Sequence, residues 1–163
     1  MFYKVKYGNS LKLNLSLSER GSNIKIIGQG KISSKKNLRL RANTSVVSIG
    51  GEIQLGENVF FNRNCNIISR QTIFIGNNVS MGHNVCVIDH DHIFNKEKVC
   101  GTEYNTGEII IEDGCWLGSN VVVLKNTKIG EGSVIGAGTI VKGNIPPHSI
   151  VTMDRELKIK HIL

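Results

Sequence analysis

Two carboxylates and two imidazoles alternate in the run Asp89-His90-Asp91-His92, the densest cluster of titratable side chains in the sequence. A neutral imidazole accepts a proton near pH 7, so either histidine could act as a general base while a carboxylate orients its ring. Histidine and aspartate are also metal ligands, and in an exposed corner the same run would simply be solvated. The residue types alone leave three interpretations open: a catalytic base, a metal site and a polar corner.

The segment that follows this run, residues 93–110, lacks the hydrophobic pattern of its surroundings and contains Gly101 and Gly107. Long irregular loops inside a compact fold are usually functional or disordered. We therefore expect an extruded loop that leaves the fold directly after His92. This placement is the main indication of where chemistry would take place.

The elements that position this run are short strands in a six-residue repeat. From Ile111 to Pro146 the sequence reads IEDGCW, LGSNVV, VLKNTK, IGEGSV, IGAGTI and VKGNIP. A helix of roughly 3.6 residues per turn cannot place every sixth residue on one face. A solenoid can, and three hexads would close a triangular coil of about 18 residues with the opening residues stacked inside. The opening residues are Ile111, Leu117, Val123, Ile129, Ile135 and Val141.

The repeat is expected to begin at Ile49 and to shift register once, where Ile73-Phe74 reads as a two-residue insertion that bulges one corner. Residues 1–48 are less regular and are expected to form one or two opening coils. The expected organisation is one all-β domain over 1–163, with a solenoid at 49–146, its loop at 93–110 and a short tail at 147–163. The further opening residues are Ile49, Leu55, Phe61, Ile67, Ile75, Met81 and Val87.

The composition fits a stack of aliphatic ladders, because 40% of the residues are hydrophobic while only 6% are aromatic. The 18 glycines suit repeated tight corners. The net charge of +7 comes with little interleaving of basic and aromatic residues, so no nucleic-acid partner is expected. A phosphate-bearing cofactor or an acidic glycan accounts better for the charge.

The cysteines at positions 65, 86, 100 and 115 show no paired spacing, which predicts small buried side chains at Cys65 and Cys115 and a reducing cytoplasm. The longest aliphatic run, Val121–Leu124, is far too short to span a membrane. The opening MFYKVK lacks the apolar core of a signal peptide.

The sequence VIDHDHIF, a loop, and then IIIEDGCWLGSNVVVLKNTKIGEGSVIGAGTIV followed by PP resembles the hexapeptide-repeat acyltransferases. It is most similar to bacterial polysaccharide and sugar O-acetyltransferases of the maltose and galactoside group, from about Val46 to Pro147. The resemblance implies a left-handed parallel β-helix. It also implies that His92 deprotonates the acceptor hydroxyl, and that Glu103 orients the ring, with Asp89 and Asp91 as alternatives.

The same resemblance implies where the acetyl donor lies. Small residues would let a pantetheine arm lie against backbone amides, Trp116 would line its channel, and basic residues would meet the coenzyme A phosphates. Ser119 and Ala137 are 18 positions apart and should stack, with His83 in the coil before them. The implied donor-binding residues are Trp116, Gly118, Ser119, Gly136, Ala137, Gly138, Lys142 and Lys160, with Lys158 also within reach.

Acceptor contacts are implied for Asn62 and Asn64, together with Asp89, His90 and Asp91. Where the sugar acetyltransferases carry an aspartate soon after these asparagines, this sequence has Arg70. Asparagine is also common at coil turns, so a purely structural role for Asn62 and Asn64 remains open.

The resemblance thus implies an acetyl-CoA-dependent O-acetyltransferase that acts on a sugar hydroxyl of a surface glycan precursor such as capsule or lipopolysaccharide. It implies a cytoplasmic homotrimer with active sites between subunits. A serine acetyltransferase and a catalytically silent scaffold are the alternatives. A zinc-dependent carbonic anhydrase of the same fold is not expected, because two histidines separated by four residues are absent, and no metal requirement is predicted.

Overall fold

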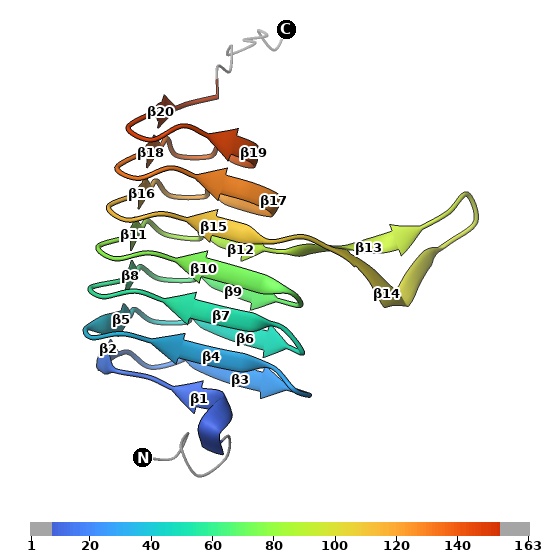
Figure 1. Cartoon of the computed structure of the whole chain (residues 1–163), viewed down its shortest axis with the longest axis horizontal. Coiled ribbons are helices and arrows are strands. Elements are labelled where there is room, and N and C mark those ends of the chain that lie inside the picture. Colours follow the sequence, from blue (N-terminus) through green and yellow to red (C-terminus); the bar gives the residue numbers. More distant parts are fainter. Residues whose placement is uncertain (1–7, 154–163) are drawn as a thin grey trace, which may run out of the picture.

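The computed structural model describes residues 8–153, which form a parallel β-solenoid of about six turns, as expected for a left-handed β-helix. Figure 1 shows the coils stacked one above another from the N-terminal to the C-terminal end, with a single hairpin projecting from the side. A short 3-10 helix, η1 (Gly8–Ser10), precedes the first strand. Lys158, Lys160 and most of the predicted tail lie outside the described residues.

Each coil contributes strands to three faces, and strands of successive coils pair in parallel. The first face holds β3 (Asn23–Ile27), β6 (Ser45–Ile49), β9 (Asn66–Ser69), β12 (Cys86–Ile88) and the beginning of β17 (Val122–Ile129). The second face holds β1 (Leu11–Lys12), β4 (Lys31–Ser34), β7 (Glu52–Leu55), β10 (Thr72–Ile75), β15 (Ile109–Ile111) and the end of β17. Strand β19 (Ile140–Ile145) pairs along β17 on both faces.

The third face is a separate seven-stranded sheet. It consists of β2 (Leu15–Ser18), β5 (Leu38–Leu40), β8 (Phe60–Phe61), β11 (Ser80–Met81), β16 (Trp116–Leu117), β18 (Val134–Ile135) and β20 (Ile150–Val151). Two corners carry most of the predicted site residues. We call the corner between the first and second faces the hairpin corner, and the corner where the third face passes back to the first the return corner.

The coils are not all of one length. Above the hairpin, paired residues such as Leu117 and Ile135 are 18 positions apart, as the hexads predict. Below it, Ile53 pairs with Ile73, 20 positions apart, and Ile24 pairs with Val46, 22 positions apart. The extra residues lie at the hairpin corner, so the predicted two-residue insertion falls at Arg70 and Gln71 rather than at Ile73-Phe74.

The interior is a set of aliphatic ladders, and the predicted opening residues line it with one exception. Ile49 is only half-buried, because Val46 of the same strand takes the interior position and pairs with Ile67. Cys65 and Cys115 are fully buried, as predicted, and all four cysteines are free. Representative interior residues are Val46, Leu55, Phe61, Ile67, Ile75, Met81, Val87, Ile111, Leu117, Val123, Ile129 and Ile135.

Asparagine side chains stack along two edges of the prism. Asparagine tolerates the positive φ of a left-handed turn better than most residues. At the return corner the amides of Asn43, Asn64, Asn84 and Asn120 are joined by hydrogen bonds of 3.0–3.4 Å. Asn37, Asn58 and Asn78 form the second ladder. These ladders hold successive turns in register.

The segment predicted as an irregular loop is an antiparallel hairpin. Strand β13 (His90–Phe94) pairs with β14 (Val99–Thr106), and the hairpin leaves the solenoid at the hairpin corner (Figure 1). It therefore includes His90 and His92, which were predicted to precede the loop. The solenoid resumes at Ile109, which is fully buried, whereas the loop was predicted to end at residue 110.

Candidate active site

Asp89 anchors the base of the hairpin from inside the solenoid. Its side chain is fully buried and accepts hydrogen bonds from the Ser69 hydroxyl at 2.7 Å and from the backbone N–H groups of Arg70 and Gln71 at 2.8 and 2.9 Å. These donors replace the water that a buried carboxylate loses. Asp89 therefore secures the corner, and it is not positioned for the acceptor contact that the sequence predicted.

His90, the first residue of the hairpin, is oriented by the same carboxylate. Its Nδ1 lies 3.1 Å from Asp89 Oδ1, and its ring meets the Tyr104 ring edge-on with centroids 5.4 Å apart. A carboxylate partner favours the tautomer with the proton on Nδ1. The histidine that an aspartate orients is thus His90, not His92.

His92 lies exposed on the same strand, with Nδ1 at 3.1 Å from the backbone carbonyl oxygen of Cys100. A carbonyl oxygen only accepts hydrogen bonds, so Nδ1 carries the proton and Nε2 keeps a lone pair. This is the tautomer that a general base needs.

The structure does not bring Glu103 to His92. In the hairpin register His92 is opposite Tyr104, whose ring centroid is 4.7 Å from that of His92. Because side chains alternate along a strand, Glu103 lies on the other face of the hairpin. The orienting partner of His92 within this chain is a backbone carbonyl, so the predicted role of Glu103 is not supported.

Asp91, between the two histidines, faces the body of the solenoid. Its Oδ2 lies 3.5 Å from Nζ of Lys125, a lysine that is itself only 7% exposed. Lys125 follows Val123, which pairs with Val87, so it stands one coil above Asp89. The ion pair links the hairpin to the coil above.

Sequence reasoning missed two side chains that contact the histidines or their neighbours. Tyr104 touches both imidazole rings, and the guanidinium carbon of Arg70 lies 3.4 Å from the centre of the Tyr104 ring. A regular antiparallel hairpin with residues 95–98 as the turn would have placed Gly101 opposite His92. The register shift between His92 and Phe94, which residue types do not reveal, brings Tyr104 there. Arg70 was noticed only as a departure from the resemblance.

The predicted donor residues lie at the return corner and on the adjoining third face. The His83 N–H donates to the Ser119 hydroxyl at 3.2 Å, and the Gly138 N–H donates to the Ser119 carbonyl at 2.8 Å, so the expected stack of His83, Ser119 and Ala137 is present. At Gly118 a Cβ would lie 2.7 Å from the backbone nitrogen of Ala137, so glycine is needed there for packing.

Two features of this corner suit a ligand with amide and apolar groups. Within residues 8–153, no acceptor is found for the backbone N–H groups of Ser119 and Ala137. Trp116 opens β16 with 56% of its surface exposed, which excludes a core role within this chain. Gly136 and Ala137 occupy the positions of Gly118 and Ser119 one coil above.

The remaining predicted residues are less informative. Lys142 is exposed on β19, and Asn64 belongs to the asparagine ladder of the return corner. The Asn62 side-chain oxygen accepts the N–H of Arg63 at 2.9 Å. Both asparagine amides thus serve the turn itself, which favours the structural interpretation of Asn62 and Asn64.

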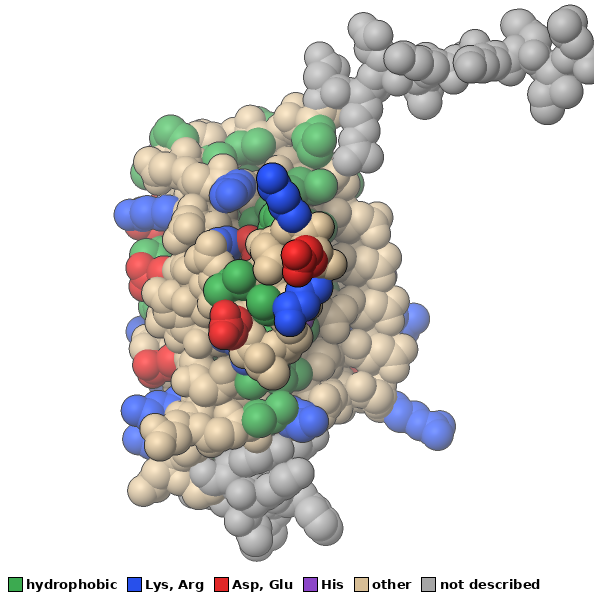
Figure 2. Space-filling model, turned by 90° about the vertical axis from the view of Figure 1, so that its right-hand side faces the viewer, with side chains coloured by type: hydrophobic (Ala, Val, Ile, Leu, Met, Phe, Trp, Pro, Cys, Tyr) green, Lys and Arg blue, Asp and Glu red, His purple; other side chains and the backbone are tan. Residues whose placement is uncertain are grey.

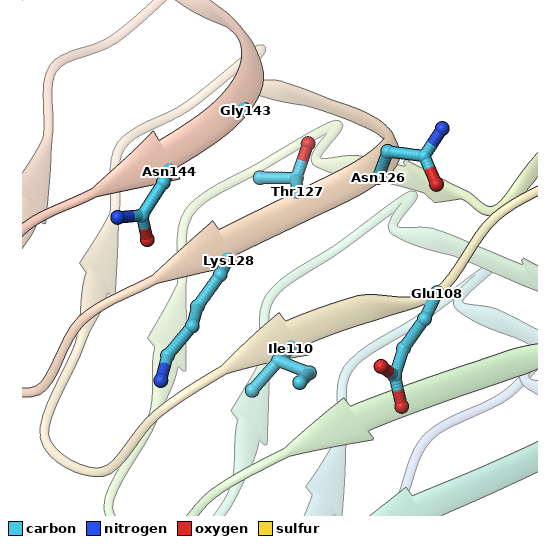
Figure 3. Close-up of a pocket in the computed structure, with 7 residues that line it drawn as sticks. All are labelled: Glu108, Ile110, Asn126, Thr127, Lys128, Gly143 and Asn144. Carbon is cyan, nitrogen blue, oxygen red and sulfur yellow. The ribbon is translucent and has the colours of Figure 1, made fainter.

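A shallow pocket of about 250 Å³ lies on the outer surface across β15, β17 and β19 (Figure 3). Lys128, on its rim, pairs with Glu112 at 2.8 Å, and this hydrogen bond, with one from the Glu131 N–H, lowers the pKa of the Glu112 carboxyl. The lining residues are Glu108, Ile110, Asn126, Thr127, Lys128, Gly143 and Asn144.

The end of the hairpin carries exposed apolar side chains. Phe94 is 75% exposed and Val99, its partner across the hairpin, is 63% exposed. Figure 2 faces the side from which the hairpin projects, and apolar, basic and acidic side chains are mixed there. Such a tip suits contact with another protein surface.

In the part of the chain that the structure describes, no three His, Cys, Asp or Glu side chains are grouped so that they could hold a metal ion. His83 lies at the return corner, whereas His90 and His92 lie at the hairpin corner. Among the same residues, no helix is long and apolar enough to cross a bilayer.

Comparison with known proteins supports the resemblance. Residues 108–143 match the family model described as bacterial transferase hexapeptide (six repeats). Galactoside O-acetyltransferase of Escherichia coli is 37% identical over 103 residues, which make up 63% of this chain and 51% of that protein. A protein of the same organism, provisionally named a lipopolysaccharide biosynthesis O-acetyl transferase, is 31% identical over 110 residues, covering 62% of this chain and 56% of the relative.

Among solved structures, a hexapeptide-repeat acetyltransferase of Vibrio cholerae in complex with acetyl coenzyme A matches with a TM-score of 0.64 and 26% identity. The match covers 73% of this chain and 64% of that one. The chain spans about half the length of the curated relatives it matches. In sequence and in fold it resembles the hexapeptide-repeat acetyltransferases.

Proposed function

We propose that this protein transfers an acetyl group from acetyl-CoA to a hydroxyl of a sugar. The proposal rests on the environment of His92. A backbone carbonyl oxygen holds its Nδ1, and the side chain is exposed near the base of the hairpin, which leaves Nε2 to act as the base. The names of the relatives, a galactoside O-acetyltransferase among them, support the reaction class and the sugar acceptor.

In the proposed mechanism His92 Nε2 removes the proton from the acceptor hydroxyl as the oxygen attacks the thioester carbonyl. The free N–H groups near Ser119 would stabilise the oxyanion of the tetrahedral intermediate. When the intermediate collapses, the imidazolium returns the proton to the departing coenzyme A thiolate. The transfer is direct, with no acyl-enzyme.

We further propose that the active site forms between subunits of a homotrimer. His92 belongs to the hairpin corner, while the Ser119 and Ala137 column belongs to the return corner, so a single chain separates base and donor groove on two edges of the prism. A second copy could bring its return corner to the hairpin of the first. The exposed pair Phe94 and Val99 supplies apolar surface for that contact.

The acceptor is proposed to be a precursor of a surface glycan, supported by the lipopolysaccharide biosynthesis relative. Four free cysteines fit a reducing cytoplasm, where such precursors and acetyl-CoA would be met. Serine acetylation and a catalytically silent scaffold are the competing functions.

One assay separates these functions. Acetyl-CoA is incubated with the protein and a panel of sugars, or with serine, and free thiol release is followed. We expect release that depends on a sugar and is unchanged by a chelator. Release that depends only on serine, or none with any acceptor, would contradict the proposal.

A further inference from the structure

The Arg70 guanidinium stacks on the Tyr104 ring and has no polar partner among the described residues. Its carbon lies 3.4 Å from the centre of the Tyr104 ring, and the same ring contacts His90 and His92. Nε is buried, and the part of the chain that the structure describes offers it no hydrogen-bond partner. No ion pair or side-chain hydrogen bond joins this guanidinium to another residue in the range 8–153.

The backbone explains why Arg70 is held at this place. Its N–H donates to Asp89 Oδ1 at 2.8 Å, which fixes the residue at the hairpin corner. The two-residue extension of this coil creates the corner on which Arg70 stands. Aromatic stacking orders the guanidinium but satisfies none of its N–H groups.

Nearby carboxylates do not neutralise it. Asp89 is occupied by Ser69, by two backbone N–H groups and by His90, and Asp91 faces Lys125 on the opposite side of the strand. A guanidinium that is oriented, partly desolvated and unpaired is suited to a planar anion such as a carboxylate, or to a phosphate.

We infer that the acceptor carries an anionic group, a carboxylate or a phosphate, and that Arg70 binds it while His92 deprotonates a nearby hydroxyl. This inference rests on the proposed function, because it names the substrate class of the same site. Tyr104 sets the distance between Arg70 and the histidines, since its ring lies against the guanidinium and against both imidazoles. Arg70 is thus the residue that selects uronic acids, sialic acids or sugar phosphates over neutral sugars.

The competing explanation is that Arg70 only braces the hairpin by stacking on Tyr104. A brace would affect all acceptors alike, whereas an anion-binding residue discriminates between them. The test therefore compares matched acceptors: methyl galactoside with methyl galacturonoside, and glucose with glucose 6-phosphate. N-acetylneuraminic acid is added as a second carboxylate, so that the preferences for a uronic acid, a sialic acid and a sugar phosphate are measured separately.

Acetyl transfer is measured for the wild-type protein and for Arg70→Gln, Arg70→Lys and Arg20→Gln. We expect Arg70→Gln to raise the KM for the preferred anionic acceptor about 10- to 100-fold, as for a lost charge-assisted hydrogen-bond pair. Its KM for the matched neutral sugar and its coenzyme A affinity should stay unchanged. Arg70→Lys should keep part of the preference. Arg20→Gln makes the same change of charge at an exposed turn and should keep all of it.

Binding measured by calorimetry in the presence of coenzyme A tests the inference without turnover. Tighter binding of an anionic sugar, lost in Arg70→Gln, supports the inference even if no acetyl transfer occurs, and in that case the proposed function alone fails. Equal weakening of neutral and anionic sugars would identify a brace. Equal or absent binding of all five sugars to the wild-type protein would overturn the inference.

Discussion

His90 and His92 lie two residues apart on one face of the hairpin, yet their surroundings suit them to different roles. The His90 side chain is 13% exposed and turns Nδ1 toward a buried carboxylate. His92 is exposed, and a backbone carbonyl holds its Nδ1. An acceptor hydroxyl must reach Nε2 from solvent, so His92 fits the base and His90 fits a positioning residue.

Replacing His92 with alanine should therefore lower kcat by about 10² to 10⁴ and leave coenzyme A affinity nearly intact, because a lost general base costs that much in rate. Steady-state kinetics and calorimetry check this. His90→Ala serves as the comparison and should lose less. If His90→Ala is inactive while His92→Ala keeps near full activity, the base has been misassigned.

Trp116 offers an apolar surface next to the return corner. If a pantetheine arm lies along that corner, Trp116→Ala should raise the coenzyme A Kd by about tenfold, as expected for the loss of about 1–2 kcal/mol of apolar contact. The acceptor KM should move much less, and coenzyme A should alter the indole fluorescence of the wild-type protein. Unchanged coenzyme A binding in folded Trp116→Ala would show that the donor site does not lie at this corner.

Cys65 should make stability depend on alkaline pH. Burial raises the pKa of its thiol from 9.0 to about 11, so the folded state holds the proton that the unfolded state releases. The free energy of unfolding that this group contributes is complete below pH 9 and is lost as pH rises toward 11. Denaturant titrations from pH 8 to 11 measure the loss. Cys65→Ala should reduce the slope, and an identical slope in both proteins would show that the thiol does not contribute.

At the residue scale, the sequence predicted candidate side chains for the chemistry but not the partners that orient them in the structure. The family resemblance implied His92, and the 18-residue spacing placed Ser119 beneath Ala137. The partner of His92 is the carbonyl of Cys100, and backbone atoms leave no mark in residue types. Asp89 was predicted to contact the acceptor or to orient the base, because nothing in the run shows that its side chain turns into the corner.

At the element scale, the hairpin is tied to the solenoid by the ion pair of Lys125 and Asp91. Lys125 is almost fully buried, so removing its partner leaves an uncompensated charge. Asp91→Asn should therefore destabilise the hairpin base more than Lys125→Met, which keeps the aliphatic stem and removes the charge. Hydrogen exchange of peptides from 90–106 should quicken most in Asp91→Asn. Exchange of β9 and β10 should change little. Equal exchange rates of the 90–106 peptides in both variants would show that the Lys125–Asp91 ion pair does not hold the hairpin base.

The hairpin itself was predicted as a loop for a physical reason. Its strands pair only with each other, so neither face is packed in a core, and no alternation of apolar and polar residues arises. The solenoid strands are half-buried in every coil, and the period of six therefore shows clearly. The register error at Ile49 has a related cause, since the lower coils carry extra corner residues and Val46 takes the interior position.

At the scale of the whole molecule, the proposed base and the proposed donor-binding residues lie at two separate corners of one chain. The proposed base lies on a hairpin that leaves the prism, and the N–H groups of Ser119 and Ala137 lie along another edge. In the proposed homotrimer, one repeated interface would bring each hairpin to the return corner of a neighbouring subunit. Gel filtration with light scattering should give three chains per particle.

Mixing two inactive variants tests the shared site directly. His92→Ala lacks the base, and Ala137→Glu, at an exposed position of the return corner, should block the donor groove without disturbing the interior. Each variant alone should be inactive. In trimers assembled at random from equal amounts, a working site needs the base from one variant and the groove from the other, so about one quarter of the sites should be restored. Co-expression with two affinity tags and a thiol-release assay measures this fraction. A mixed trimer no more active than its parents would place base and donor groove in one chain, and the proposed interface would fail.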